Sequence, residues 1–310
     1  MKKVTKANLY FLILLLIEII GPYGMREIYI ATGVRDSRVI QAISSIVLIL
    51  LPAIIYILIT KGKFKQVLRL NKLTLKQIMI TIIIAIVCIP LSMCLSIIGV
   101  MFFKNNIGAY MTSIATSTPL IVMLLLVAVM PAIIEEISLR GVVLWGYNGQ
   151  SKVMAALFTG VFFGILHLDG HQFLAAAVLG FIMAYVVRVT NSIFSSMIIH
   201  FIINGSSVIV LARSLSMTNS DEIAKQAQNL DMTQISLDTK IMIIIGVTII
   251  GICLFGLIFK LIQKMEKNNL YSTPQIVEGA QVASLEKGGL INIPLLLIII
   301  VYLLVMVLKI

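Results

Sequence analysis

Six polar residues that could do chemistry lie in strongly apolar stretches of this 310-residue chain. They are Glu135, Glu136, Arg140, His167, His200 and Asn204. If these stretches cross a bilayer, each charged group costs roughly 2.5–3.5 kcal/mol at the membrane centre. Such residues usually face the interior of a helix bundle or a water-filled cavity, and they mark functional sites. The six residues are therefore the first candidates for a site.

The two glutamates and the arginine share one predicted helix. Glu136 and Arg140 are four residues apart, so they lie on one face and can form an ion pair. Glu135 is turned about 100° from Glu136 and has no partner on its own helix. A buried ion pair beside a second carboxylate that is protonated or faces water is the structural alternative, but it leaves the presence of Glu135 unexplained. Pro131 lacks a backbone N–H, which predicts a kink just before the glutamates.

The other three residues come from two further predicted helices. His200 and Asn204 are four residues apart and share a face, whereas His167 ends an earlier apolar stretch. A lone histidine in a helix is more often a packing residue than a ligand, but these residues do not occur alone. Counted from the predicted cytoplasmic ends, Glu135 and these three residues all lie roughly 15–22 Å deep. The common depth predicts one polar cavity near the middle of the bilayer.

Two related chemistries suit this set of residues. His167, His200 and Glu135 could hold a metal such as Zn²⁺, with a water in the open position. Alternatively, Glu135 could act as general base on a water, with His and Asn side chains stabilising the oxyanion. Both chemistries hydrolyse a carbonyl compound. The sequence has no G-x-S-x-G, H-E-x-x-H, P-loop or G-x-G-x-x-G motif, so a serine nucleophile elbow and a standard zincin are excluded.

The elements that must position these residues are predicted membrane helices. The chain is 60% hydrophobic and 12% charged, with a mean hydropathy of +1.08, which excludes soluble, disordered and disulfide-scaffold classes. We predict an all-α, polytopic transmembrane helix bundle of about nine spans. The spans are roughly 8–24, 39–60, 77–103, 119–147, 153–168, 172–188, 193–212, 240–260 and 290–308. The fifth and sixth spans are short and should form a tight helical hairpin.

The charge distribution predicts the orientation of the bundle. The net charge is +11, and the segment 61–76 holds six basic residues and no acid. With the N-terminus cytoplasmic, this loop and the loops 148–152, 189–192 and 261–289 lie inside, which satisfies the positive-inside rule. The basic excess therefore indicates topology and not nucleic-acid binding. The lipid bilayer is the predicted surrounding, and the prediction is a multi-pass protein of the cell membrane.

Three motifs together resemble those of the CAAX protease and bacteriocin-processing family, the Abi group of intramembrane endopeptidases. They are Glu135-Glu136-Ile137-Ser138-Leu139-Arg140, Phe163-Gly164-Ile165-Leu166-His167 and His200-Phe201-Ile202-Ile203-Asn204. Each motif alone is weak, but their order on separate helices and their matched depth make the combination specific. The resemblance covers residues 119–212, the predicted catalytic core. Residues 1–118 would be N-terminal helices, and residues 213–310 a polar loop and two C-terminal helices.

The resemblance implies an endopeptidase whose substrate is a peptide or membrane protein. By the same resemblance, Glu135 activates water, Glu136 and Arg140 support it, and His167, His200 and Asn204 bind water, metal or oxyanion. Whether Zn²⁺ is required stays open. The rival functions are a noncatalytic bacteriocin-immunity or scaffold protein and, less favoured, an ion-coupled transporter. Glu18, near the outer end of the first predicted span, is explained by snorkelling or a local partner more readily than by function.

Overall fold

The computed structural model describes residues 2–217, 235–270 and 289–309, and within these ranges the regular structure is helical, with no strand. The all-α prediction is thereby confirmed. The helices are α1 (Lys3–Thr32), α2 (Ser37–Ser45), α3 (Leu51–Ile59), α4 (Phe64–Val67), α5 (Leu75–Val100), α6 (Asn106–Ser117), α7 (Leu120–Met123), α8 (Met130–Glu136), α9 (Leu144–Gly146), α10 (Lys152–Leu166), α11 (Gly170–Thr190), α12 (Ile193–Met217), α14 (Leu237–Leu270) and α16 (Ile293–Lys309). Three π-helical segments join some of them: η1 (Ile46–Leu50), η2 (Leu124–Val129) and η3 (Ile137–Val143).

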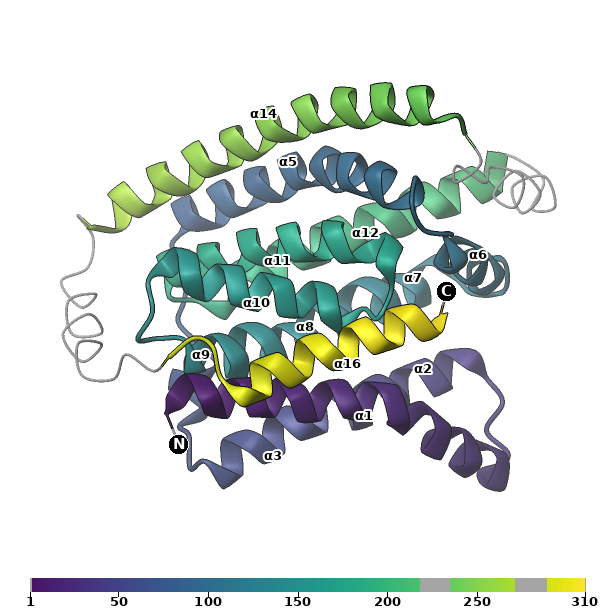
Figure 1. The fold of residues 1–310 in the computed structure, drawn as a ribbon, viewed down its shortest axis with the longest axis horizontal. Coiled ribbons are helices and arrows are strands. Elements are labelled where there is room, and N and C mark those ends of the chain that lie inside the picture. Colours follow the sequence, from purple (N-terminus) through teal and green to yellow (C-terminus); the bar gives the residue numbers. More distant parts are fainter. Residues whose placement is uncertain (1, 218–234, 271–288, 310) are drawn as a thin grey trace.

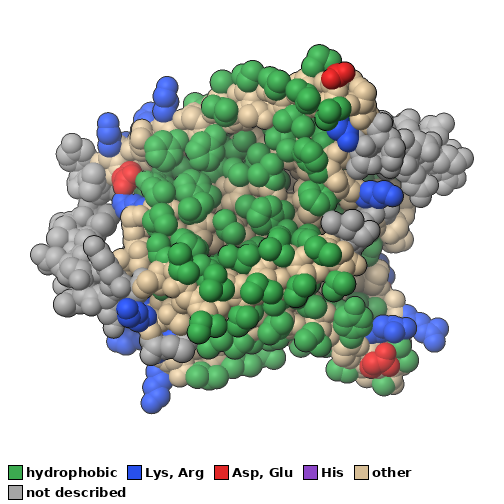
Figure 2. All heavy atoms as spheres, in the orientation of Figure 1, with side chains coloured by type: hydrophobic (Ala, Val, Ile, Leu, Met, Phe, Trp, Pro, Cys, Tyr) green, Lys and Arg blue, Asp and Glu red, His purple; other side chains and the backbone are tan. Residues whose placement is uncertain are grey.

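Apolar helices long enough to cross a bilayer make up most of the described chain. Seven qualify by length and composition: Lys3–Thr32, Ser37–Ile59, Leu75–Val100, Leu120–Gly146, Gly170–Thr190, Ile193–Met217 and Leu237–Asn268. Helices α10 and α16 are apolar but shorter. Each of the nine predicted spans thus falls on a helix, while the count of nine and the orientation stay predictions. Figure 2 shows a broad apolar face with Lys and Arg side chains at its two ends, as a multi-pass membrane protein requires.

The helices run side by side in an ordered bundle (Figure 1). Helices α5 and α14 pack together along one side, α10, α11 and α12 lie in the middle, and α1, α2 and α3 form the other side, with α16 packed on α1. The largest core cluster includes Phe11, Phe162 and Ile298. The rings of Phe11 and Phe162 stack with centroids 4.4 Å apart. Residues from all three predicted segments therefore share one core, and the division at residues 118 and 212 stays a prediction.

Several element ends differ from the sequence prediction. Helix α1 continues through Pro22 to Thr32 and ends at Gly33, whose φ of 72° suits glycine. The predicted outer end near residue 24 was wrong, because a helix in lipid keeps its backbone bonds despite a proline. Helix α6 lies in the predicted loop 104–118, and α14 runs to Leu270, past the predicted end at residue 260. Parts of the predicted loops 213–239 and 261–289 lie outside the described residues.

Two of the prolines follow π-helical segments, whose turns are wider than those of an α-helix. Segment η1 ends just before Pro52, and segment η2 ends just before Pro131. A proline has no N–H and its ring clashes with the carbonyl four residues back, so a π turn gives that carbonyl room. The predicted irregularity before the glutamates therefore takes the form of a π turn. The third π segment, η3, follows the glutamates directly, and no feature of the sequence predicted it.

The predicted hairpin of two short helices is confirmed as α10 and α11. Glycines let the two backbones approach closely. A Cβ atom on Gly160 would lie 2.6 Å from the Ala177 carbonyl oxygen and 2.6 Å from the Phe181 nitrogen. A Cβ on Gly164 would lie 2.8 Å from the Phe173 carbonyl oxygen. Such small-residue contacts drive helix association in membranes, and here they position the end of α10, where His167 lies.

Candidate active site

The ion pair between Glu136 and Arg140 forms the centre of the predicted site. Nη1 of Arg140 donates to Oε1 of Glu136 over 2.8 Å, and both side chains are 0% exposed. Nη2 of Arg140 donates to the Gly180 carbonyl of α11 over 3.3 Å. The predicted pairing is confirmed. In a low-dielectric interior each partner keeps the other charged, so the pair is a rigid support.

His200 of α12 joins this pair from the opposite side. Its Nδ1 donates to Oε1 of Glu136 over 2.8 Å. The side chain is nearly fully buried, and α12 packs against both α8 and η2. Oε1 of Glu136 therefore accepts from Arg140 and from His200, which fixes the direction in which the imidazole points.

Glu135 faces the other nitrogen of the same imidazole. Its Oε2 lies 3.8 Å from Nε2 of His200, and its side chain is 20% exposed. The two consecutive glutamates thus have different surroundings, as their angular separation predicts: Glu136 is enclosed and paired, while Glu135 is partly exposed. A gap of 3.8 Å is longer than a hydrogen bond and suits a bridging water.

The ring of Phe163 contacts both His167 and the cluster that contains His200 and Arg140. Nδ1 of His167 donates to the Phe163 carbonyl over 2.7 Å. The Phe163 ring centroid is 4.8 Å from that of His167 and 5.6 Å from that of His200. The guanidinium carbon of Arg140 lies 4.4 Å from the same ring, a cation–π contact. One phenylalanine therefore packs the two histidines and the arginine together.

Asn204 is one turn beyond His200 but does not reach the glutamates. Its Nδ2 donates to the Val127 carbonyl over 3.0 Å. That carbonyl belongs to η2, where the π turn leaves backbone groups without regular helical partners. In this arrangement Asn204 holds α12 against the continuous helix Leu120–Gly146, which carries both glutamates and is called the site helix below. Among the described residues, neither Asn204 nor His167 forms a hydrogen bond to Glu135.

The bonding partners of the two histidines determine where each ring carries a hydrogen. A carbonyl and an ionised carboxylate only accept, so Nδ1 donates in both His167 and His200. Nε2 then carries a lone pair when the ring is neutral and a hydrogen when the ring is a protonated imidazolium. A lone pair can accept from water or bind a metal, whereas an N–H can donate to a developing oxyanion.

A three-ligand metal site is not assembled in this arrangement. In the part of the chain that the structure describes, no group of three or more His, Cys, Asp or Glu side chains lies close enough to hold a metal ion. As placed, His167, His200 and Glu135 do not form such a group, and a requirement for zinc stays a prediction.

Arg69 is a residue that the sequence analysis missed. It lies in the basic segment 61–76, yet it is only 4% exposed and has a φ of 48°. Its guanidinium donates to the carbonyls of Arg140 and Leu144, at 2.9 and 3.5 Å, and to the side chain of Asn148. Burial and the nearby charge of Arg188 lower the pKa of Arg69 to about 9. Arg69 thus caps the C-terminal end of the site helix, Leu120–Gly146, and nothing distinguishes it in sequence from the basic residues around it.

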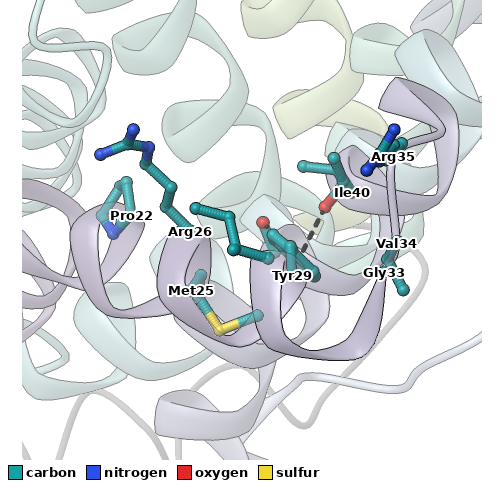
Figure 3. A pocket seen from close by; sticks show the side chains of 10 residues that line it. Pro22, Met25, Arg26, Tyr29, Gly33, Val34, Arg35 and Ile40 are labelled. Atoms are coloured by element: carbon teal, nitrogen blue, oxygen red, sulfur yellow. Dashed lines mark hydrogen bonds between the residues drawn. The ribbon is translucent and has the colours of Figure 1, made fainter.

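A separate cavity of about 370 Å³ opens between α1 and α2 (Figure 3). Arg26, Tyr29 and Arg35 are among the residues that line it. Tyr29 donates to the Ile40 carbonyl over 3.3 Å. None of the six predicted site residues lines this cavity.

Comparison with known proteins bears on the same helices. No curated protein and no solved structure matches the chain. A family model does match, over residues 117–206, a range that contains all six predicted site residues. The model is described as Type II CAAX prenyl endopeptidase Rce1-like, which confirms the resemblance that the three motifs indicated. Residues 117–206, which run from the end of α6 into α12, are thus similar to Rce1-like endopeptidases, and the seven long apolar helices are those of a multi-pass membrane protein.

Proposed function

We propose that this protein is an intramembrane endopeptidase of the CAAX prenyl protease type, which uses water activated by Glu135. The family match supports a protease of this type. The observation that carries the mechanism is the placement of His200 between the two glutamates, with Nδ1 on Glu136 and Nε2 facing Glu135. The substrate would be a peptide or a membrane protein, and the site of action the cell membrane.

The reaction follows from these atoms. Glu135 takes a proton from a water as the water oxygen bonds to the scissile carbonyl carbon. The resulting oxyanion is stabilised by Nε2–H of protonated His200 or His167. When the C–N bond breaks, the proton held by Glu135 passes to the leaving amine. Glu136 and Arg140 take no proton; they keep His200 in position, so they are positioning residues.

Replacing the proposed base tests the function. Purified wild type and Glu135→Gln would be reconstituted in liposomes with a library of lipid-anchored and transmembrane peptides, and cleavage followed by mass spectrometry. We expect Glu135→Gln to lose about 100-fold or more of the rate while keeping its melting temperature. Glu27→Gln is the matched control, because Glu27 is 71% exposed and remote from the site. Equal cleavage by wild type and Glu135→Gln would contradict the proposal.

The same preparation tests the alternatives. Zinc bound by His167, His200 and Glu135 would give about one metal ion per chain in elemental analysis, lost in His167→Ala. A noncatalytic immunity or scaffold protein would keep its phenotype in Glu135→Ala and cut no peptide. An ion-coupled transporter would lose ion flux in Glu135→Ala, again without cleavage. Each outcome differs from the proteolysis expected here.

A further inference from the structure

The cavity between α1 and α2 lies outside both the family match and the candidate active site. It forms where α1 ends at Gly33 and the chain continues to Ser37, the first residue of α2 (Figure 3). Its apolar lining comes from Pro22, Met25, Ile30, Val34 and Ile40. The match begins at residue 117, so the proposed peptidase function leaves this cavity without a role.

Two arginines border the same apolar cavity. Arg26 of α1 and Arg35 of the connection to α2 both line it, and Figure 3 shows them on either side of Tyr29. Both arginines are exposed, so their guanidinium groups can reach a ligand that enters from outside. Tyr29 is buried between them, and its hydroxyl group is bound to Ile40 and Ser44 of α2. Tyr29 thus fixes the two helices that form the walls.

The acidic groups near these arginines leave their charges largely uncompensated. Nη1 of Arg26 lies 3.8 Å from Oε1 of Glu27, and both side chains are more than 70% exposed, so this pair contributes little. Asp36 is bound to Arg38, whose Nε and Nη2 donate to it over 2.8 and 2.5 Å. In the described part of the chain, Arg35 has no hydrogen bond or ion pair. The cavity therefore offers two guanidinium groups to an anion.

The surroundings of the cavity are apolar and lipid-facing. On the same stretches of α1 and α2, the large apolar side chains that are exposed are those of Ile20, Tyr23, Ile28, Val39 and Ile43. Arginine side chains near helix ends commonly reach the lipid headgroups. Arg26 and Arg35 differ from such scattered arginines because they border one cavity with an apolar lining. An inorganic anion would leave this lining uncovered, whereas an amphiphile with an anionic head would cover it.

We propose that the cavity between α1 and α2 binds the headgroup of an anionic phospholipid, with Arg26 and Arg35 on its phosphate. Guanidinium groups form charge-assisted, often bidentate hydrogen bonds with phosphate oxygens. The volume of about 370 Å³ is at the lower end of the range of ligand sites, which suits a headgroup and not a whole lipid. The acyl chains would then lie along the exposed apolar side chains of α1 and α2.

Native mass spectrometry of the full-length protein in detergent tests the proposal. Wild type and the double variant Arg26→Gln with Arg35→Gln would be titrated with phosphatidylglycerol, phosphatidylcholine or sodium phosphate. We expect wild type to prefer phosphatidylglycerol. Each arginine near an anionic headgroup contributes about fivefold in affinity, so the double variant should bind phosphatidylglycerol about 30-fold more weakly. Arg213→Gln is the matched control, because Arg213 is an exposed arginine near the end of α12 that does not line the cavity.

Three results would overturn the proposal. Equal binding of phosphatidylglycerol by wild type and the double variant would show that the arginines do not hold the lipid. Equal binding of the two lipids by wild type would show that the negative charge is not recognised. Binding of phosphate without binding of phosphatidylglycerol would make the cavity a site for free anions.

The fold of the variants is checked by thermal unfolding without added lipid. Both arginines are exposed, so the double variant should melt as wild type does. The single variant Arg35→Gln, with an expected loss of about fivefold, gives the same comparison with one substitution. None of these measurements uses peptide cleavage, so their result is independent of the proposed function.

Discussion

Nδ1 of His200 and Oε1 of Glu136 lie 2.8 Å apart, although the two residues are 64 positions apart in the chain. This bond connects α12 to the helix that carries both glutamates. It also turns Nε2 of His200 toward Glu135. A buried carboxylate, an imidazole and a second, partly exposed carboxylate therefore follow one another in space. On this order we base the proposed roles, with Glu136 positioning the imidazole and Glu135 acting on water.

Removing the imidazole should abolish catalysis without unfolding the bundle. We expect His200→Ala to lower kcat about 100-fold or more, because the imidazole that faces Glu135 is lost. His171→Ala is the matched control, since His171 lies in the first turn of α11 and, in the described part of the chain, its side chain has no hydrogen bond or ion pair to a glutamate. Cleavage rates and melting temperatures of both variants in liposomes check the prediction. A His200→Ala enzyme with normal kcat would refute it.

Breaking the buried ion pair should mainly destabilise the fold. Arg140→Met leaves Glu136 enclosed beside a histidine, and we expect a loss of about 3–5 kcal/mol. The double variant Glu136→Leu with Arg140→Met should recover most of this loss, because no unpaired charge remains, yet stay inactive. Thermal unfolding in detergent measures both effects. Arg26→Met, at a site 73% exposed, should match wild type; a single variant as stable as this control would contradict the prediction.

Close backbone contact between α10 and α11 should make Gly160 intolerant of a methyl group. The added Cβ would lie 2.6 Å from two backbone atoms that cannot move aside easily. We expect Gly160→Ala to destabilise by about 1–3 kcal/mol, despite the better helix propensity of alanine. A Cβ on Gly246 meets nothing within 4 Å, so Gly246→Ala should be neutral or slightly stabilising. Equal melting temperatures for the two variants would show that the hairpin is looser than described.

Arg69 should be needed to hold the C-terminal end of the site helix, Leu120–Gly146. Arg69→Ala removes donors from the carbonyls of Arg140 and Leu144, and we expect a loss of about 2 kcal/mol or more. Arg69→Lys should recover little, because one ammonium cannot reach several carbonyls in the fork geometry of a guanidinium. Lys65→Ala, an exposed change in the same basic loop, is the control. Unfolding curves that coincide for Arg69→Ala and Lys65→Ala would rule the prediction out.

The sequence alone predicted most of the fold class and of the central ion pair. Apolar stretches of bilayer length predict helices whatever they pack against, since backbone groups in lipid must bond within the helix. The i,i+4 spacing of Glu136 and Arg140 predicts their pairing because it depends on one helix only. The helix ends were predicted less well. The first predicted span ended near residue 24, but α1 continues through Pro22 to Thr32, because a helix in lipid keeps its backbone hydrogen bonds.

Only the tertiary structure decided which of these polar groups lie together. The sequence grouped Glu135, His167, His200 and Asn204 by depth. The structure directs His200 to both glutamates, His167 to a backbone carbonyl and Asn204 to η2, because these choices depend on how separate helices pack. Packing also buries Arg69. The sequence therefore determined which residues could do chemistry, while helix packing decided which of them face Glu135, the carboxylate that we propose as the base.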